Sequence, residues 1–161
     1  MTTAETISDT LLPASLRRRE TFALIKLAAL VRQECAEKLA GTGLSQHQHA
    51  ILCCLEEFGA TFQKDIAVRL GIDSGDIVAF IDGLQARGLV VRRRDERDRR
   101  RQILTITAGG SQALAEAEEL YGQAESELLG VLSPSQREAL HEAALLVLSA
   151  HAPESWLAED E

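Results

Sequence analysis

The densest group of side chains with binding chemistry in this sequence is a run of arginines. Residues 87–101 read RGLVVRRRDERDRRR, where eight arginines stand against three acidic residues and leave a local charge of +5. The other nine basic and 22 acidic residues give the rest of the 161-residue chain a charge of −13. Because the local field governs docking, a basic segment on an acidic protein indicates a site for a polyanion. A solvated charged loop is the alternative, although like charges this dense are unfavourable without a partner.

Three cysteines are the next candidates for chemistry. Cys35, Cys53 and Cys54 are odd in number and stand in apolar, helix-forming surroundings, which favours reduced core thiols over a disulfide framework. Redox sensing by Cys53 and Cys54 stays open as an alternative. Against it, adjacent cysteines pair only with backbone strain, and we expect no basic group beside them to lower the pKa of a thiol.

Two histidines, His47 and His49, lie at the start of a helical segment. Residues two apart on a helix do not face one another, so we do not expect this pair to chelate a metal. Partly buried or capping histidines are the simpler interpretation. The sequence also contains no phosphate-cradling glycine loop, paired metal motif or nucleophile elbow. We therefore expect no enzyme, no cofactor and no metal site.

The elements that position these side chains begin with helices. Apolar residues at spacings of three and four predict a first helix of about six turns from Leu16 onward. They are Leu24, Ala28, Val31, Cys35 and Leu39. Ser45 and Gln48 form a capping box that starts the second helix. We assign its buried face to Ile51, Leu52, Leu55 and Phe58.

Two further helices follow with a short connection between them. A short helix is predicted from Thr61, and Gly71 is placed for a left-handed turn at its end. Asp73 is a capping residue for the next helix, which Gly88 closes. A short helix, a glycine-containing turn and a second helix form a helix-turn-helix.

Extended patterns replace helical ones after this motif. Residues 89–91 and 102–107 are rich in β-branched residues and predict two strands of a hairpin. The charged connection between them, 94–101, is too long for a two-residue turn and must protrude as a wing. Residues 108–110 lead into another helix, and Ser-Pro-Ser-Gln at 133–136 caps and starts the last one.

Length and composition limit the class of protein. A chain of 161 residues suits one domain over residues 1–161, and 45% hydrophobic with 26% charged residues are ordinary globular values. No apolar run approaches the roughly 18 residues that a membrane span requires, so we expect a soluble, cytoplasmic protein. The apolar stripes of residues 14–40 and 111–150 exceed what one small core covers, which favours a dimer. Residues 1–12 and 152–161 are expected to be flexible tails.

Several segments, in this order and spacing, resemble the MarR family of transcription regulators over about residues 20–150. The most specific are GLV at 88–90, DRR at 98–100 and LTITAGG at 104–110, with isoleucine where the family usually has leucine before Thr107. The segment DIAVRLGID at 65–73 is also similar to the family. The resemblance implies a mainly α-helical winged helix-turn-helix with a small β-hairpin wing. It occupies residues 45–110, between N- and C-terminal dimerisation helices.

By this resemblance, the second helix of the motif enters the major groove of duplex DNA, and the wing contacts the minor groove. It implies base-edge contacts by Ser74, Gly75, Asp76, Val78 and Ala79. Asp76 accepts a hydrogen bond from cytosine or, alternatively, only favours the helix N-terminus electrostatically. In the wing, Arg100 reaches the minor groove and Asp98 steadies it. Contacts to phosphate, or otherwise solvated surface charges, are expected for Lys64, Arg69, Arg93 and Arg97. Arg99 and Arg101 of the wing are also expected to bind DNA.

The resemblance further implies a homodimer on a pseudo-palindromic operator and a repressor that a small aromatic or acidic effector releases. His47 and His49 lie near the region where family members hold such a ligand. The alternative from another class is a winged-helix module whose arginines bind an acidic protein partner. A steep salt dependence of duplex binding distinguishes the two.

Overall fold

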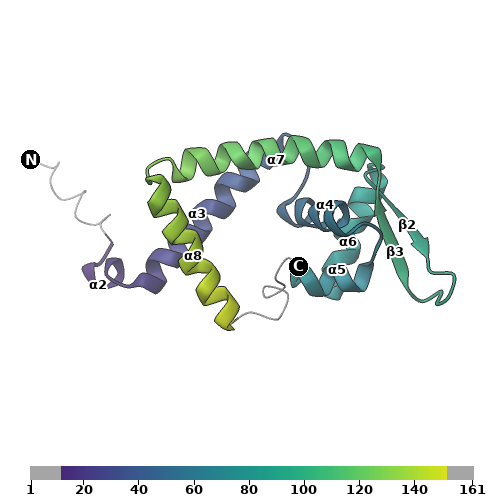
Figure 1. The fold of residues 1–161 in the computed structure, drawn as a ribbon, viewed down its shortest axis with the longest axis horizontal. Helices are drawn as coiled ribbons and strands as arrows, with labels where there is room; N and C mark the ends of the chain where they lie inside the picture. The colour runs from purple at the N-terminus through teal and green to yellow at the C-terminus, as the bar shows by residue number, and fades with distance from the viewer. Residues whose placement is uncertain (1–11, 152–161) are drawn as a thin grey trace, which may run out of the picture. The chain divides into compact units, whose positions relative to one another are not determined.

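Residues 12–151 are described in the computed structural model of the chain (Figure 1). Contacts divide the chain into two compact units, Met1–Glu34 and Cys35–Glu161. Helices α2 (Ala14–Arg17) and α3 (Glu20–Ala40) come first, and α3 crosses the boundary between the units. Apart from Leu12, the expected flexible tails lie outside the described residues. Within residues 12–151, no helix has both the length and the apolar character that a membrane span needs.

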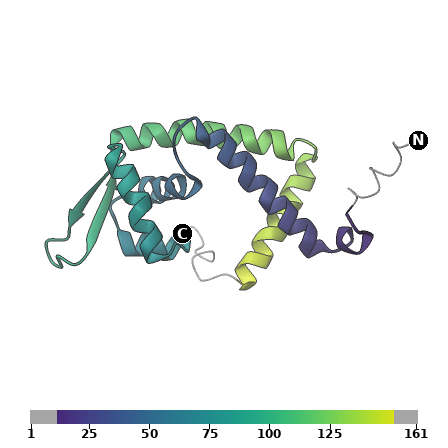
Figure 2. The ribbon, with the colours of Figure 1, turned by 180° about the vertical axis from the view of Figure 1, so that it is seen from behind.

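The second unit contains a helix-turn-helix, a hairpin and two long helices, so the expected fold class is confirmed. Figure 2 shows the hairpin projecting beyond the helices beside it. The elements are α4 (Gln46–Phe58), β1 (Thr61–Phe62), α5 (Gln63–Leu70), α6 (Ser74–Ala86), β2 (Val90–Arg94), β3 (Gln102–Ile106), α7 (Ala108–Leu129) and α8 (Pro134–His151).

The caps predicted from short motifs are present. Ser45 and Gln48 form both hydrogen bonds of a capping box at the start of α4. The Asp73 carboxylate accepts a hydrogen bond from the Gly75 N–H at 2.8 Å and so caps α6. Gly71 ends α5 at φ +61°, a left-handed conformation in which a side chain would be strained. These signals are local, which is why sequence alone located them.

The sheet has three antiparallel strands in the order β1-β3-β2. The expected hairpin pairs Val90 with Ile106 and Arg94 with Gln102. Strand β1 corrects the prediction of a helix from Thr61, because Thr61 pairs with Leu104 and α5 begins two residues later, at Gln63. The physical reason is that the edge of β3 away from β2 carries backbone groups that can still form hydrogen bonds. Thr61 and Phe62 are extended because they pair with that edge.

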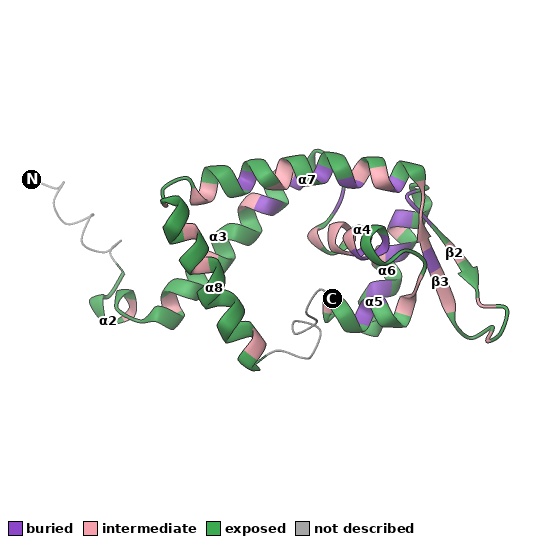
Figure 3. Ribbon diagram, viewed as in Figure 1, coloured by how far each residue is buried: buried purple, intermediate pink, exposed green. Residues whose placement is uncertain are grey.

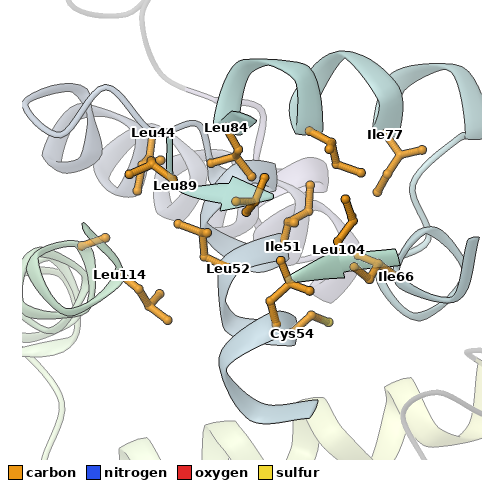
Figure 4. Close-up of a cluster of buried hydrophobic side chains, with 14 of the residues drawn as sticks. Leu44, Ile51, Leu52, Cys54, Ile66, Ile77, Leu84, Leu89, Leu104 and Leu114 are labelled. Carbon is orange, nitrogen blue, oxygen red and sulfur yellow. The ribbon is translucent and has the colours of Figure 1, made fainter. Parts of the chain in front are cut away.

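The hydrophobic core lies within the winged helix, where α4, α5, α6, β3 and α7 meet (Figures 3 and 4). Ile51, Leu52 and Leu55 of α4 are fully buried, as expected. Phe58 is not, because its side chain is 50% exposed and lies under the Arg69 guanidinium, 4.0 Å from the ring centroid. The first apolar stripe also differs, since Cys35 and Leu39 are buried while Leu24 and Val31 are exposed.

The wing joins α7 at a crowded backbone junction. Thr107 Oγ1 donates a hydrogen bond to the Gly88 carbonyl at 2.7 Å and accepts one from the Gly110 N–H at 3.0 Å. Thr107 also caps α7. A Cβ atom at Gly110 would clash with the carbonyl oxygen of Leu89 and with the side chain of Ile106. Position 110 therefore requires glycine, because the Leu89 carbonyl approaches its backbone too closely to leave room for a side chain.

Substituting Gly110→Ala should lower the free energy of unfolding by about 3 kcal/mol, the upper part of the usual range for overpacking. Gly109→Ala is the matched control, since its Cβ would meet its nearest neighbour, Thr107 Oγ1, at an ordinary 3.6 Å. Because alanine favours helices, this control should be neutral or stabilising by up to about 1 kcal/mol. Urea unfolding followed by circular dichroism measures both. Equal stability of the two variants would contradict the close-approach argument.

Candidate nucleic-acid interface

The outer face of α6 is presented by the packing of its inner face. Ile77 and Ile81 are buried in the core against Ile66 of α5, so the opposite side of the helix is left to solvent. The residues expected to face base edges are all exposed, namely Ser74, Gly75, Asp76, Val78 and Ala79. Asp76 lies in the first turn, where its negative charge also interacts favourably with the helix dipole.

The wing tip is folded by its acidic residues. Asp95 accepts a hydrogen bond from the Arg97 N–H at 3.1 Å, and Asp98 accepts one from the Arg100 N–H at 3.0 Å. Two backbone hydrogen bonds, from Asp95 to Arg101 and from Arg101 to Asp98, close the same loop. The sequence signal of such Asx turns is an aspartate whose carboxylate accepts a hydrogen bond from the backbone N–H two residues later. Sequence reasoning assigned a role only to Asp98, as the partner of Arg100.

Arg100 is almost fully exposed at this tip. Its side chain is 95% exposed, and its Nε lies 3.5 Å from Asp98 Oδ1, so the expected salt bridge between these two residues is present. An ion pair this exposed contributes little stability. The pair places the Arg100 guanidinium beside the Asp98 carboxylate.

The eight arginines fall into two groups that the sequence did not separate. Three hold the wing and α6 to their surroundings. Arg87 donates to the carbonyls of Thr42 and Gly43 at 2.8 Å, Arg92 pairs with Asp82 at 2.6 Å, and Arg101 lies over the Phe62 ring at 3.4 Å. The other five are exposed and remain available to a polyanion: Arg93, Arg94, Arg97, Arg99 and Arg100.

A hollow of about 250 Å³ lies between the helix-turn-helix and residues 100–102 of the wing. Four of the expected contact residues line this one concave surface, namely Lys64, Ser74, Arg100 and Arg101. Phe62 and Arg101 form part of the same wall. Arg69 lies apart from it, stacked on Phe58. The concave surface with its basic rim suits a phosphate backbone.

The two histidines pack on different helices. The His47 ring stacks on Phe80 of α6 at 4.7 Å, whereas the His49 ring stacks on Tyr121 of α7 at 4.4 Å. His49 Nε2 also lies 2.5 Å from Glu118 Oε1. The two imidazoles therefore have separate surroundings, and neither belongs to the basic surface.

The three cysteines are reduced thiols, and Cys35 and Cys54 are buried as expected. A contact that the sequence did not indicate places the Cys53 sulfur 3.6 Å from His49 Nε2. Sequence reasoning missed this contact because it considered only the residues adjacent to Cys53 in sequence, whereas His49 precedes Cys53 by one helical turn. Burial and the nearby Glu118 carboxylate nevertheless raise the pKa of Cys53 to about 12, and burial raises the pKa of Cys54. The thiolate form is thus disfavoured at both positions.

Comparison with known proteins identifies the same elements. The family model described as "MarR family" matches residues 44–101, from the start of α4 to the end of the wing. A solved structure of the transcriptional repressor CouR bound to a 23-mer DNA duplex is 31% identical, with a TM-score of 0.80 over 85% of this chain and 97% of that chain. The chain belongs to the MarR family.

Other MarR-type and related proteins extend the comparison. CouR bound to p-coumaroyl-CoA is 29% identical, with a TM-score of 0.74 over 89% of this chain and 99% of that chain. A MarR family regulator from Rhodococcus sp. RHA1 is 23% identical with a TM-score of 0.72 over 79% of this chain and 90% of that chain, a likeness of fold. A protein of Thauera aromatica assigned to regulation of the hcr operon is 35% identical over 78 residues, 48% of this chain and 47% of its own length. The match therefore spans less than half of that relative.

Membership of the MarR family makes the chain one of the DNA-binding transcription regulators, a family of proteins that are not enzymes. The geometry explains two parts of the MarR signature. The DRR segment at 98–100 forms the salt-bridged wing tip, and Gly110 permits the contact between α7 and Leu89.

Proposed function

We propose that this chain is a homodimeric repressor that binds a pseudo-palindromic duplex and leaves it when a small effector binds. The observation that carries the proposal is the set of five exposed wing arginines beside the exposed face of α6. A helix fits the major groove, and arginine suits the narrow minor groove of A·T-rich DNA. The duplex-bound CouR structure, similar over nearly its whole chain, supports the same assignment.

In this proposal each part of the surface has its own task. The residues of α6 that meet base edges are Ser74, Gly75, Asp76, Val78 and Ala79. Among them, the Asp76 carboxylate rejects base edges that present only hydrogen-bond acceptors. Arg100 enters the minor groove with Asp98 restricting its direction. The phosphate contacts come from Lys64, Arg69, Arg93, Arg97, Arg99 and Arg101. For Arg69 and Arg101 this adds to their stacking on phenylalanine.

Replacing Arg99→Ala together with Arg100→Ala should weaken duplex binding by at least about tenfold, the loss typical of one good arginine contact. The slope of log K against log salt should flatten by about 0.9 for each phosphate that the variant no longer neutralises. Fluorescence anisotropy over a salt series, on a duplex selected from a random pool, measures both quantities.

Replacing the same two residues with lysine is the matched control, because it keeps the charge and removes the planar guanidinium. This variant should retain the wild-type salt slope. Unchanged affinity and slope in the alanine variant would contradict the wing assignment. Capture of an acidic protein in excess duplex would instead favour a protein-interaction module.

The proposed dimer rests on apolar surface that α8 leaves open. Helix α8 contains no buried residue, and Leu146 and Val147 are 73% and 59% exposed. In the other unit, the part of α3 before residue 35 likewise exposes Leu24 and Ile25. Exposed apolar patches on this scale mark interaction surfaces. A two-fold dimer would present two α6 helices to successive half-sites.

Leu146→Glu should convert the dimer to a monomer, because the charge would be desolvated at the interface. Val68→Glu is the control, since Val68 is 68% exposed on α5 and the change adds the same charge. That variant should stay dimeric. Analytical ultracentrifugation distinguishes the two, and removal of residues 133–161 should also give a monomer. A truncated or Leu146→Glu protein that dimerises and binds operator normally would refute the interface.

We further propose that the effector is aromatic and acidic, with His47 and His49 contributing to its site. The support is the related CouR structure that holds p-coumaroyl-CoA, a ligand with both properties. Effector binding lowers DNA affinity if the ligand prefers a conformation that DNA does not.

Adding p-coumaroyl-CoA to the protein–duplex complex should lower the apparent affinity for DNA by about fivefold or more, the usual scale of such coupling. Coenzyme A alone is the control for the aromatic group. Anisotropy of the labelled duplex gives the change. Identical duplex affinity with and without saturating p-coumaroyl-CoA would exclude this ligand class.

A further inference from the structure

Three potential metal ligands meet at the seam between α4 and α7. His49 and Cys53 lie one turn apart on α4, and Glu118 faces them from α7. Their nearest ligand atoms, a ring nitrogen, a sulfur and a carboxylate oxygen, all lie within 4.8 Å of one another. All three residues belong to the unit Cys35–Glu161. This cluster is separate from the basic surface, and of its three members only His49 has a role in the proposed function, at the effector site.

The separations fit the edges of a zinc coordination tetrahedron. With Zn–N and Zn–O bonds of about 2.0–2.1 Å and Zn–S bonds of about 2.3 Å, ideal angles place sulfur about 3.6 Å from nitrogen or oxygen. Cys53 Sγ lies 3.6 Å from His49 Nε2 and 3.7 Å from Glu118 Oε1. The third edge, His49 Nε2 to Glu118 Oε1, is 2.5 Å and must open to about 3.3 Å. Glu118 is exposed, so its side chain has room to make that movement.

The surroundings of the cluster hold two ligands in place and leave the third side accessible. Stacking on Tyr121 fixes the plane of the His49 ring, whose side chain is 12% exposed. Cys53 is half-buried beside it, whereas the Glu118 side chain is 58% exposed and borders solvent. A cation thus has an approach from the α7 side without opening the core.

We propose that His49 Nε2, Cys53 Sγ and Glu118 Oε1 form a three-ligand site for a zinc-like divalent cation, with the fourth position left to water or another small ligand. Nitrogen and sulfur donors select zinc over magnesium or calcium, which take oxygen ligands. A thiolate and a carboxylate balance the two positive charges, and the thiol proton of Cys53 is released to solvent on binding. This departs from the sequence-based expectation of no metal site.

Cobalt substitution tests the site directly on the full-length protein. Co²⁺ added to chelator-treated protein should give one equivalent of tetrahedral d–d absorption per chain, together with a sulfur-to-cobalt charge-transfer band. Cys53→Ser should abolish that band, and His49→Gln should weaken Zn²⁺ binding in a chromophoric chelator competition. We expect a loss of more than about 100-fold, beyond the range for groups that only support ligands.

Matched controls come from the neighbouring residues. Cys54→Ser removes an adjacent thiol that faces the core, and His47→Gln removes the imidazole that stacks on Phe80. Both should bind Co²⁺ and Zn²⁺ as the wild type does. Circular dichroism of each variant confirms that it is folded, and His49→Gln and Glu118→Gln keep the test valid if Cys53→Ser unfolds.

The possible outcomes distinguish a built site from incidental binding. Absence of the charge-transfer band in the wild type, or its survival in Cys53→Ser, would overturn the site and leave His49 and Glu118 as a simple ion pair. Octahedral weak absorption that none of the variants changes would identify adventitious surface binding and overturn it as well. None of these readouts involves DNA, so the metal site and the repressor assignment stand or fail independently.

Discussion

The position of the wing depends on the contact between the Leu89 carbonyl and the backbone of Gly110, where no side chain fits. Thr107 closes this junction from both sides, because its hydroxyl donates to Gly88 and accepts from Gly110. The end of α6, the root of the hairpin and the first turn of α7 are therefore joined within a few residues. A rigid root lets a charged hairpin protrude into solvent while its base stays fixed relative to α6.

Some charged residues of the wing stabilise its fold, whereas others are exposed and available to bind a partner. Arg92 and Arg101 are held by Asp82 and Phe62, so their side chains are already ordered within the protein. At the tip, Asp95 and Asp98 accept backbone hydrogen bonds and shape the loop. The arginines left exposed are thereby displayed on an ordered loop. A pre-ordered loop loses less conformational entropy on binding than a flexible basic tail would.

Sequence reasoning located what is encoded locally and missed what depends on distant partners. The capping boxes and the turn at Gly71 need only residues a few positions apart, and they are where the patterns predicted them. Strand β1 needs the edge of β3, some forty residues later, so local patterns predicted helix there. In the same way, Phe58 packs under Arg69 of the next helix and not in the core. The β-branched segments and the length of the charged connection predicted the wing, but no local pattern separates the three anchoring arginines from the exposed ones.

Helix α4 contacts α6, which carries part of the proposed DNA-binding surface, and α7, whose first turn is joined to the root of the wing. The Gln48 amide donates to the Phe80 carbonyl at 3.2 Å, a contact that the absence of a side chain at Gly83 permits. On its other side, α4 meets α7 through His49 and Glu118, not far from the turn that is fixed to the wing root. Any ligand that shifts α4 against α7 must alter the contacts of α4 with α6, the contacts of α7 with the wing root, or both. By thermodynamic linkage, a DNA duplex that prefers one arrangement changes the affinity of that ligand by the same factor.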